Sequence, residues 1–140
     1  MSGEAFVDTN VLIYAHDRQA GRKALLAQEL LARLWKEKCG VLSTQVLQEF
    51  CVNARRKFQQ PMTVADVRDA ILAYQSWGLV VNTAESILRG LEIEQRYQLS
   101  FWDAMIVQAA ESAECIVLYS EDFSHGQEYC GVLVVNPFLS

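Results

Sequence analysis

Short apolar runs alternate with longer amphipathic segments along almost the whole chain. Each apolar run is brief and continuous, which predicts strands at residues 5–7, 41–42, 79–81, 115–119 and 132–135. Between them, apolar side chains recur at helical spacing over residues 11–15, 19–38, 44–58, 63–77, 83–97 and 100–113. Buried parallel strands have such continuous apolar runs, so the pattern predicts an α/β fold: a three-layer α/β/α sandwich with a parallel sheet of about five strands.

Polar residues and glycine mark the ends of several predicted helices. Thr63 with Asp66, and Ser100 with Asp103, have the spacing of a capping box, in which two side chains each accept a backbone N–H. Gly40 follows the long helix predicted for residues 19–38, where glycine often ends a helix. These signals divide the chain into the same elements as the apolar pattern.

The size and composition are typical of a globular domain. The chain has 140 residues, of which 51% are hydrophobic and 21% are charged, so we expect one domain over residues 1–140 with a packed core. No apolar run approaches the length that crosses a bilayer, and Met1–Asp8 lacks the features of a signal peptide. We therefore expect a cytoplasmic protein without membrane contact.

The cysteines and the net charge limit the possible sites and partners. Cys39, Cys51, Cys115 and Cys130 form no Cys-x-x-Cys pair, so we expect free thiols and no zinc site. The net charge of −5 argues against a broad basic surface for nucleic acid. Removing the charge of four acids in one metal site leaves −1, and a nucleic-acid partner is then no longer excluded.

Four acids, far apart in sequence, are expected at one edge of the sheet. Asp8 follows the first strand directly, and Asp122 comes three residues after the fourth strand. Glu49 lies in the second turn of the helix after the second strand, and Asp103 lies in the first turn of the helix before the fourth strand. Because ligands of open parallel sheets bind beyond the carboxyl ends of the strands, this is the edge where a site is expected.

Taken singly, most of these acids have a plainer explanation. Asp103 can be the capping partner of Ser100, Asp122 can be a turn residue, and Glu49 can lie on a solvated helix face. Asp8 is different, because an unpaired carboxylate between two apolar segments is costly. The hypothesis of a site therefore depends on the convergence of all four.

Clustered carboxylates favour a divalent cation. Two negative charges about 4 Å apart repel by about 4 kcal/mol at an effective dielectric constant of about 20. A set of oxygen ligands without histidine or cysteine suits Mg²⁺ or Mn²⁺, which can activate a water and neutralise a phosphate. This predicts phosphodiester hydrolysis, with Ser120, Asn10 and Thr9 hydrogen-bonded to the carboxylates or to a bound water.

The segments that carry these acids resemble the successive motifs of PIN domains. The segments are Asp8–Ala15, Gln48–Phe50, Phe101–Ala104 and Leu118–Phe123, and the similarity extends from residue 5 to about residue 136. The resemblance is greatest to the toxin component of VapBC-type toxin–antitoxin pairs. It implies a strand order of 3-2-1-4-5, Mg²⁺- or Mn²⁺-dependent endoribonuclease activity, homodimerisation, and inhibition by a cognate antitoxin protein.

The resemblance also assigns residues and chemistry. Asp8, Glu49, Asp103 and Asp122 occupy the four acidic positions, and Ser120 occupies the Thr/Ser position sometimes included with them. Glu121 adjoins the fourth motif and ranks second to Asp122. The implied reaction is attack of an activated water on the RNA phosphate, which leaves a 5′-phosphate and a 3′-hydroxyl.

Other interpretations remain open at this stage. One is a PIN-type nuclease that acts in RNA processing or on structured DNA without an antitoxin, and another is a PIN module that binds nucleic acid or protein but does not cleave. A phosphoacceptor receiver domain is set aside because no lysine lies near the end of the last predicted strand, residues 132–135. Arg55–Lys57 is interpreted as a solvated helix end, His16 as a surface residue, and Trp102 as a core or interface residue.

Overall fold

The computed structural model describes residues 3–139, in which the strands form a six-stranded sheet of order β3-β2-β1-β4-β6-β5. Three residues of the predicted domain lie outside the described residues: Met1, Ser2 and Ser140. The first two also belong to Met1–Asp8, the segment that lacks the features of a signal peptide. The elements in chain order are β1 (Ala5–Val7), α1 (Thr9–His16), α2 (Arg22–Glu37), β2 (Gly40–Ser43), α3 (Thr44–Arg56), α4 (Val64–Tyr74), β3 (Gly78–Val80), α5 (Ala84–Tyr97), α6 (Phe101–Ser112), β4 (Val117–Tyr119), β5 (Glu128–Tyr129) and β6 (Val132–Val135).

The sheet confirms the predicted fold class and the order of the predicted strands. β1 lies in the middle and pairs in parallel with β2 and β4, while β3 and β6 extend the parallel sheet on either side. Only β5 is antiparallel, and it pairs with β6 at the edge. The sheet therefore has one strand more than predicted.

The additional strand belongs to a short hairpin. Cys130 and Gly131 connect β5 to β6, with φ angles of 53° and 79°. A two-residue hairpin turn commonly requires positive φ at both positions, which Asn-Gly supplies most readily. Here the first position is a cysteine and β5 has 2 residues, so the sequence gives only a weak signal.

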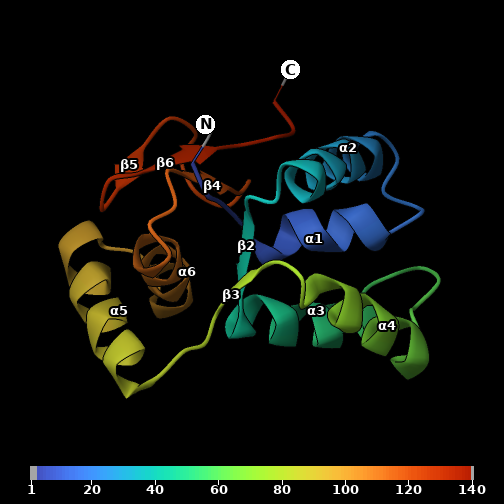
Figure 1. Ribbon diagram of the computed structural model, residues 1–140, viewed down its shortest axis with the longest axis horizontal. Helices are drawn as coiled ribbons and strands as arrows, with labels where there is room; N and C mark the ends of the chain where they lie inside the picture. The colour runs from blue at the N-terminus through green and yellow to red at the C-terminus, as the bar shows by residue number, and fades with distance from the viewer. Residues whose placement is uncertain (1–2, 140) are drawn as a thin grey trace.

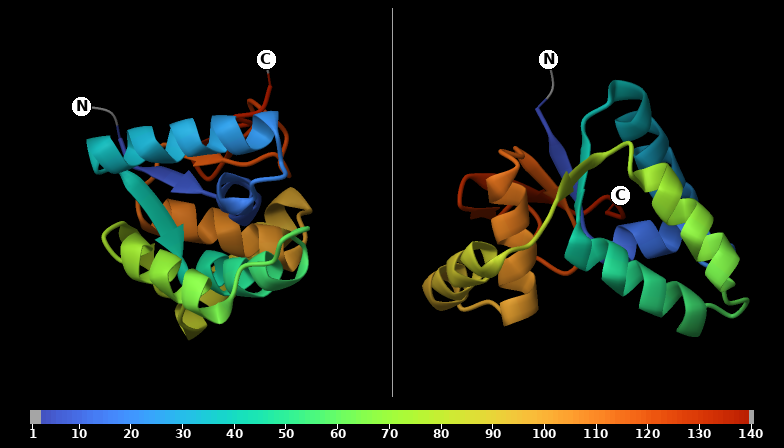
Figure 2. Two further views of the ribbon diagram at one scale, coloured as in Figure 1. Left: turned by 90° about the vertical axis from the view of Figure 1, so that its right-hand side faces the viewer. Right: turned by 60° about the horizontal axis from the view of Figure 1, so that its bottom comes forward.

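Helices cover both faces of the sheet (Figures 1 and 2). α1 to α4 lie together on one face, and α5 and α6 lie on the other, packed closely against each other. In the part of the chain that the structure describes, no helix combines the length and the apolar character needed to cross a membrane.

The core explains the apolar pattern of the central strands. All residues of β1 and β2 are buried, and Phe6 and Leu42 have no exposed surface. α6 is buried along residues 104–110 because the sheet lies on one side and α5 on the other. At the crossing of the two helices, Gly90 leaves room for Met105, whose Sδ lies 2.5 Å from where a Cβ at position 90 would be.

The end of α2 differs from the prediction. Lys38, with φ 56° and ψ 38°, adopts the left-handed conformation, and its N–H donates to the carbonyls of Leu34 and Trp35. Gly40 is the first residue of β2, and a Cβ there would lie 2.4 Å from atoms of the Trp77 ring. The interpretation of Gly40 as the helix end was wrong, because this glycine is required by the indole packed on the strand.

α3 and β4 are also shorter than predicted. α3 ends at Arg56, before the buried Phe58. β4 begins at Val117 instead of residue 115, because Glu114 adopts a positive φ of 56° and turns the chain after α6.

Candidate active site

Asp8 lies between the central strand and the first helix. Its backbone N–H donates to the carbonyl of Tyr119 in β4, and its side chain caps α1 by accepting the N–H of Thr9 at 2.7 Å. The other carboxylate oxygen, Oδ2, accepts the Ser120 hydroxyl at 2.7 Å. Asp8 is only 5% exposed, so these bonds hold a buried carboxylate in one orientation.

Glu49 reaches the same region from α3. Its Oε1 accepts the Thr9 hydroxyl at 2.5 Å, and its Oε2 accepts Gln45 Nε2 at 3.5 Å. Gln45 precedes Glu49 by one helical turn, and the same Nε2 donates to the backbone carbonyl of Trp102 at 3.2 Å. Thr9 therefore connects the acids at positions 8 and 49, and Gln45 connects α3 to α6.

Asp122 follows β4, and polar neighbours orient it. Asn10 Nδ2 donates to Asp122 Oδ2 at 2.8 Å, and the Asp122 N–H donates to Ser120 Oγ at 3.0 Å. Ser120, which has no exposed surface, thus donates to Asp8 and accepts from Asp122. The three residues predicted to support the acids, Thr9, Asn10 and Ser120, each bond to at least one of them.

Asp103 lies at the start of α6, where only half of the predicted capping box forms. Its backbone N–H donates to Ser100 Oγ at 3.1 Å. The return bond from the Ser100 N–H to the Asp103 carboxylate does not occur within residues 3–139. The prediction of a complete box was wrong here, whereas the one at Thr63 and Asp66 is complete. The Asp103 carboxylate is left available for another partner.

All four acids line one cavity of about 180 Å³. The residues that line it are Asp8, Thr9, Asn10, Gln45, Glu49, Asn53, Trp102, Asp103, Ile106 and Asp122. They come from the carboxyl end of β1, the starts of α1, α3 and α6, and the loop after β4. The structure thus brings together acids that are separated by up to 114 positions in the sequence.

Burial and mutual repulsion raise the pKa of two of these acids. Burial raises the pKa of Asp8 to about 7, although the hydrogen bonds from Ser120 and the Thr9 N–H oppose this change, and the charges of Asp122 and Glu49 add to it. Burial also raises the pKa of Asp122, followed by repulsion from Asp103 and Glu121. The cavity therefore favours either a bound proton or a bound cation.

The donor set fits a hard divalent cation. The four acids offer carboxylate oxygens, which are the ligands that such cations prefer. None of the described residues lining the cavity is Lys or Arg, so no positive side chain there neutralises the carboxylates. Within residues 3–139, no three His, Cys, Asp or Glu side chains are already close enough to form a metal site. The carboxylates therefore have the chemistry for Mg²⁺ or Mn²⁺, and a cation would have to draw them closer together.

Glu121 and His16 have other partners. Glu121 accepts Lys23 Nζ at 2.8 Å and the Tyr14 hydroxyl at 2.6 Å; burial acts to raise its pKa, but these bonds lower it. His16 is half-buried rather than on the surface, and its Nε2 lies 2.8 Å from the Tyr74 hydroxyl. Neither residue lines the cavity of the four acids.

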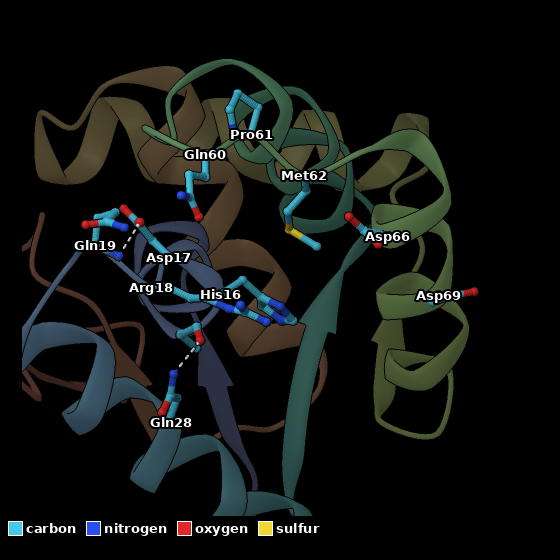
Figure 3. Close-up of a pocket in the computed structure, with 11 residues that line it drawn as sticks. His16, Asp17, Arg18, Gln19, Gln28, Gln60, Pro61, Met62, Asp66 and Asp69 are labelled. Atoms are coloured by element: carbon cyan, nitrogen blue, oxygen red, sulfur yellow. Dashed lines mark hydrogen bonds between the residues drawn. The ribbon is translucent and has the colours of Figure 1, made fainter.

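A larger cavity of about 530 Å³ lies around the other end of α1 (Figure 3). It is lined by Asp66 and Asp69 of α4, among others, and Figure 3 shows the Asp69 side chain pointing away from His16. The Asp66 carboxylate accepts the Thr63 N–H in the capping box. Because Asp66 is bonded in the capping box and Asp69 points away, the larger cavity is the weaker candidate for catalysis.

Four residues that line the smaller cavity were not part of the predicted site: Gln45, Asn53, Trp102 and Ile106. Gln45 gives a signal only through its spacing of one helical turn from Glu49. Trp102 is 63% exposed, so it is not a core residue, and its interpretation as an interface residue stays a prediction. No periodicity distinguishes it from the buried residues that follow in α6.

Replacement of Ser120 by alanine is expected to weaken binding of a divalent cation roughly 10- to 100-fold and to lower stability by about 1–2 kcal/mol. The variant loses the bonds to Asp8 and Asp122, and loss of the first raises the pKa of Asp8 further. Calorimetric titration with Mg²⁺ measures the affinity, and its rise with pH should be displaced to higher pH. Ser124→Ala, at an exposed serine in the following loop, is the control and should behave like the unmodified protein.

Comparisons with known proteins identify the family and proteins of similar fold. The family model described as "PIN domain" matches residues 5–126. Among solved structures, a toxin–antitoxin complex from Klebsiella pneumoniae superposes with a TM-score of 0.69 and 21% identity, covering 96% of this chain and 98% of that one. VapC20 of Mycobacterium tuberculosis, a toxin that cleaves the sarcin–ricin loop, gives 0.61 and 21%, covering 84% and 88%.

A structure of FitAB bound to a DNA fragment gives a TM-score of 0.69 and 16% identity, covering 97% of this chain and 96% of that one. No curated protein sequence matches the chain.

Proposed function

Because the chain belongs to the PIN domain family, we propose that it is a divalent-metal-dependent endoribonuclease. The observation that carries the proposal is the single cavity lined by Asp8, Glu49, Asp103 and Asp122. Four carboxylates without a lysine or arginine among them form an arrangement that is costly unless a cation is bound.

In this proposal the four carboxylates hold the cation, Mg²⁺ or Mn²⁺. When bound, it supplies a Lewis acid that lowers the pKa of a water and neutralises charge on the scissile phosphate. Ser120 and the Thr9 N–H fix the orientation of Asp8, the Thr9 hydroxyl fixes that of Glu49, and Asn10 fixes that of Asp122. Hydrolysis leaves a 5′-phosphate and a 3′-hydroxyl and does not use the ribose 2′-hydroxyl.

We also propose that the protein is the toxin of a type II toxin–antitoxin pair and acts in the cytoplasm as a homodimer. The superposition on a toxin–antitoxin complex over 96% of the chain supports an antitoxin partner, and the superposition on a toxin that cleaves the sarcin–ricin loop supports RNA as the substrate. Growth arrest on expression, relieved by co-expression of a small neighbouring gene, is the expected result. An RNA-processing nuclease would show no such relief.

Cleavage of purified total RNA by the purified protein tests the enzymatic proposal directly. Cleavage is expected with Mg²⁺ or Mn²⁺ and is expected to disappear with a chelator. Without the cation, no Lys or Arg among the described residues lining the cavity neutralises the charge of the carboxylates and the phosphate. Equal cleavage in chelator would contradict the proposed metal dependence. Binding without cleavage under every metal condition would instead identify a non-cleaving PIN module.

Metal binding is expected to strengthen as the pH rises toward 7. Burial raises the pKa of Asp8 to about 7, so below this pH a cation must displace a proton before it can bind the carboxylate. The apparent affinity for Mg²⁺ should therefore rise between about pH 5.5 and pH 7 and level off above about pH 8. Calorimetric titration in two buffers of different ionisation enthalpy measures the number of protons released on Mg²⁺ binding. The same titration at several pH values gives the affinity, and an affinity independent of pH would contradict the expectation.

A further inference from the structure

A groove lined mainly by uncharged side chains lies beside the cavity of the four acids. It has a volume of about 410 Å³ and is lined by Gln45, Gln48, Glu49, Val52, Asn53 and Trp102. The first five residues recur one turn apart on α3, and Trp102 closes the groove from α6. Four of the six also line the acid cavity, so the two spaces are continuous.

Trp102 presents a large aromatic surface in this groove. Trp102 is 63% exposed, although tryptophan residues are mostly buried in folded proteins. It directly precedes Asp103 of the candidate site. The ring packs edge-on against Phe101, with ring centroids 5.2 Å apart, and its backbone carbonyl accepts Gln45 Nε2. These contacts hold the indole in place while leaving it accessible.

Gln45 adds an unused polar group. The residue is 6% exposed, and within residues 3–139 its Oε1 is a buried acceptor without a hydrogen-bond partner. A buried acceptor of this kind costs about 1–3 kcal/mol unless a donor satisfies it. Gln48 and Asn53 add further amide groups, which suit the mixed donors and acceptors along the edge of a nucleobase.

The charges of the region favour a base over a phosphate in the groove. The acid cavity repels the phosphates of RNA before a cation binds, and no Lys or Arg is among the described residues lining either space. Stacking on an aromatic ring provides affinity that does not depend on charge, and every base has a face that can stack. The uncharged side chains of the groove can therefore contribute binding that the acids cannot.

We propose that the groove between α3 and α6 binds an unpaired RNA base, stacked on Trp102 and hydrogen-bonded by the amides of α3. A base within a duplex is not free to stack there, so the subsite requires an unpaired base. This inference rests on the proposed ribonuclease function and adds a base-binding subsite next to the scissile phosphate.

The test uses Asp8→Asn protein, so that RNA is bound without being cleaved, and a short unstructured oligoribonucleotide in Mg²⁺ buffer. Tryptophan fluorescence is titrated with the RNA. Quenching is expected, and Trp102→Ala in this background should weaken binding about tenfold or more and remove most of the quenching. Trp102→Phe should retain most of the affinity because phenylalanine also has a stacking face.

Trp35→Phe is the matched control. Trp35 is also exposed, at 40%, but it packs with Trp77 at the end of α2 and does not line the groove. The variant should bind RNA with unchanged affinity and retain the quenching. A series of oligoribonucleotides, each with one abasic position at a different place along the strand, maps the bound base. The strand that lacks this base should bind weakly. The oligoribonucleotide paired with its complement as a duplex should also bind weakly.

Either of two results would overturn the inference: equal RNA affinity with and without the Trp102→Ala substitution, or equal binding of every abasic strand. A shift from dimer to monomer with unchanged RNA affinity would show that a second copy of the chain occupies the groove. Failure of the ribonuclease proposal is distinguishable, because it appears as intact RNA after incubation of the unmodified protein with metal. Base binding at Trp102 is measured without cleavage.

Discussion

Asp8→Asn is expected to reduce RNA cleavage on the order of a thousand-fold, which corresponds to about 4 kcal/mol of transition-state stabilisation. Asp8 is the most buried of the four acids and contacts Ser120 and the Thr9 N–H through its two carboxylate oxygens. An asparagine retains the shape but loses the charge needed to hold a cation. Single-turnover cleavage of a labelled RNA in Mg²⁺ measures the effect, and a loss smaller than about threefold would contradict the assignment.

Thermal unfolding without metal distinguishes a lost site from a lost fold. The folded-state pKa of Asp8, about 7, is raised above the ordinary 3.8, so its contribution to stability is complete below about pH 4 and is lost as the pH rises through 7. Asp8→Asn removes this loss and should be more stable than the unmodified protein at pH 8, by at most about 4 kcal/mol. A variant that is inactive and less stable at pH 8 would instead indicate a structural role.

Gly40→Ala is expected to destabilise the protein by about 3 kcal/mol, the upper part of the usual range for overpacking a core. The added Cβ would lie 2.4 Å from ring atoms of Trp77, which is 8% exposed. The indole cannot move freely, since it packs edge-on against Trp35 and Tyr74, with ring centroids 5.4 and 5.6 Å away. Chemical denaturation followed by circular dichroism gives the free energy of unfolding.

Gly78→Ala is the matched control on the neighbouring strand. Its added Cβ would lie 3.2 Å from Val41 Cγ2, a contact that a small shift relieves, so the loss should be below about 1 kcal/mol. In the Gly40→Ala protein, Trp77→Leu should recover part of the lost stability by removing the clash. Equal losses for the two glycines would show that contact with the indole does not govern this position.

The fold class was predictable because the central strands are continuous apolar runs. β1 and β2 are buried on both faces, which leaves no alternation to confuse with a surface strand. β5 was not predictable in the same way, because its 2 residues depend on pairing with β6 and on a turn at Cys130 that lacks the usual asparagine. Gly40 was misjudged for a related reason, since its partner Trp77 is distant in sequence.

The candidate site was predictable as far as chain topology determines it. Asp8 and Asp122 follow strands, and Glu49 and Asp103 lie in the first two turns of helices at the same edge of the sheet, so all four line one cavity. Whether Asp103 is a capping residue or a free carboxylate depends on the rotamer at the start of α6, which spacing does not specify. The exposure of Trp102 depends on the position of α3, so no local pattern could reveal it.

The proposed function depends most directly on a divalent cation held by the four carboxylates. Crystals soaked in Mn²⁺ and measured for anomalous scattering locate the ion without reference to activity. A peak is expected among the side-chain oxygens of Asp8, Glu49, Asp103 and Asp122, and no peak is expected at this place in crystals of the Asp8→Asn variant. A soaked crystal of the unmodified protein with no peak in this cavity, or with its only peak beside Asp66 and Asp69, would contradict the proposed function.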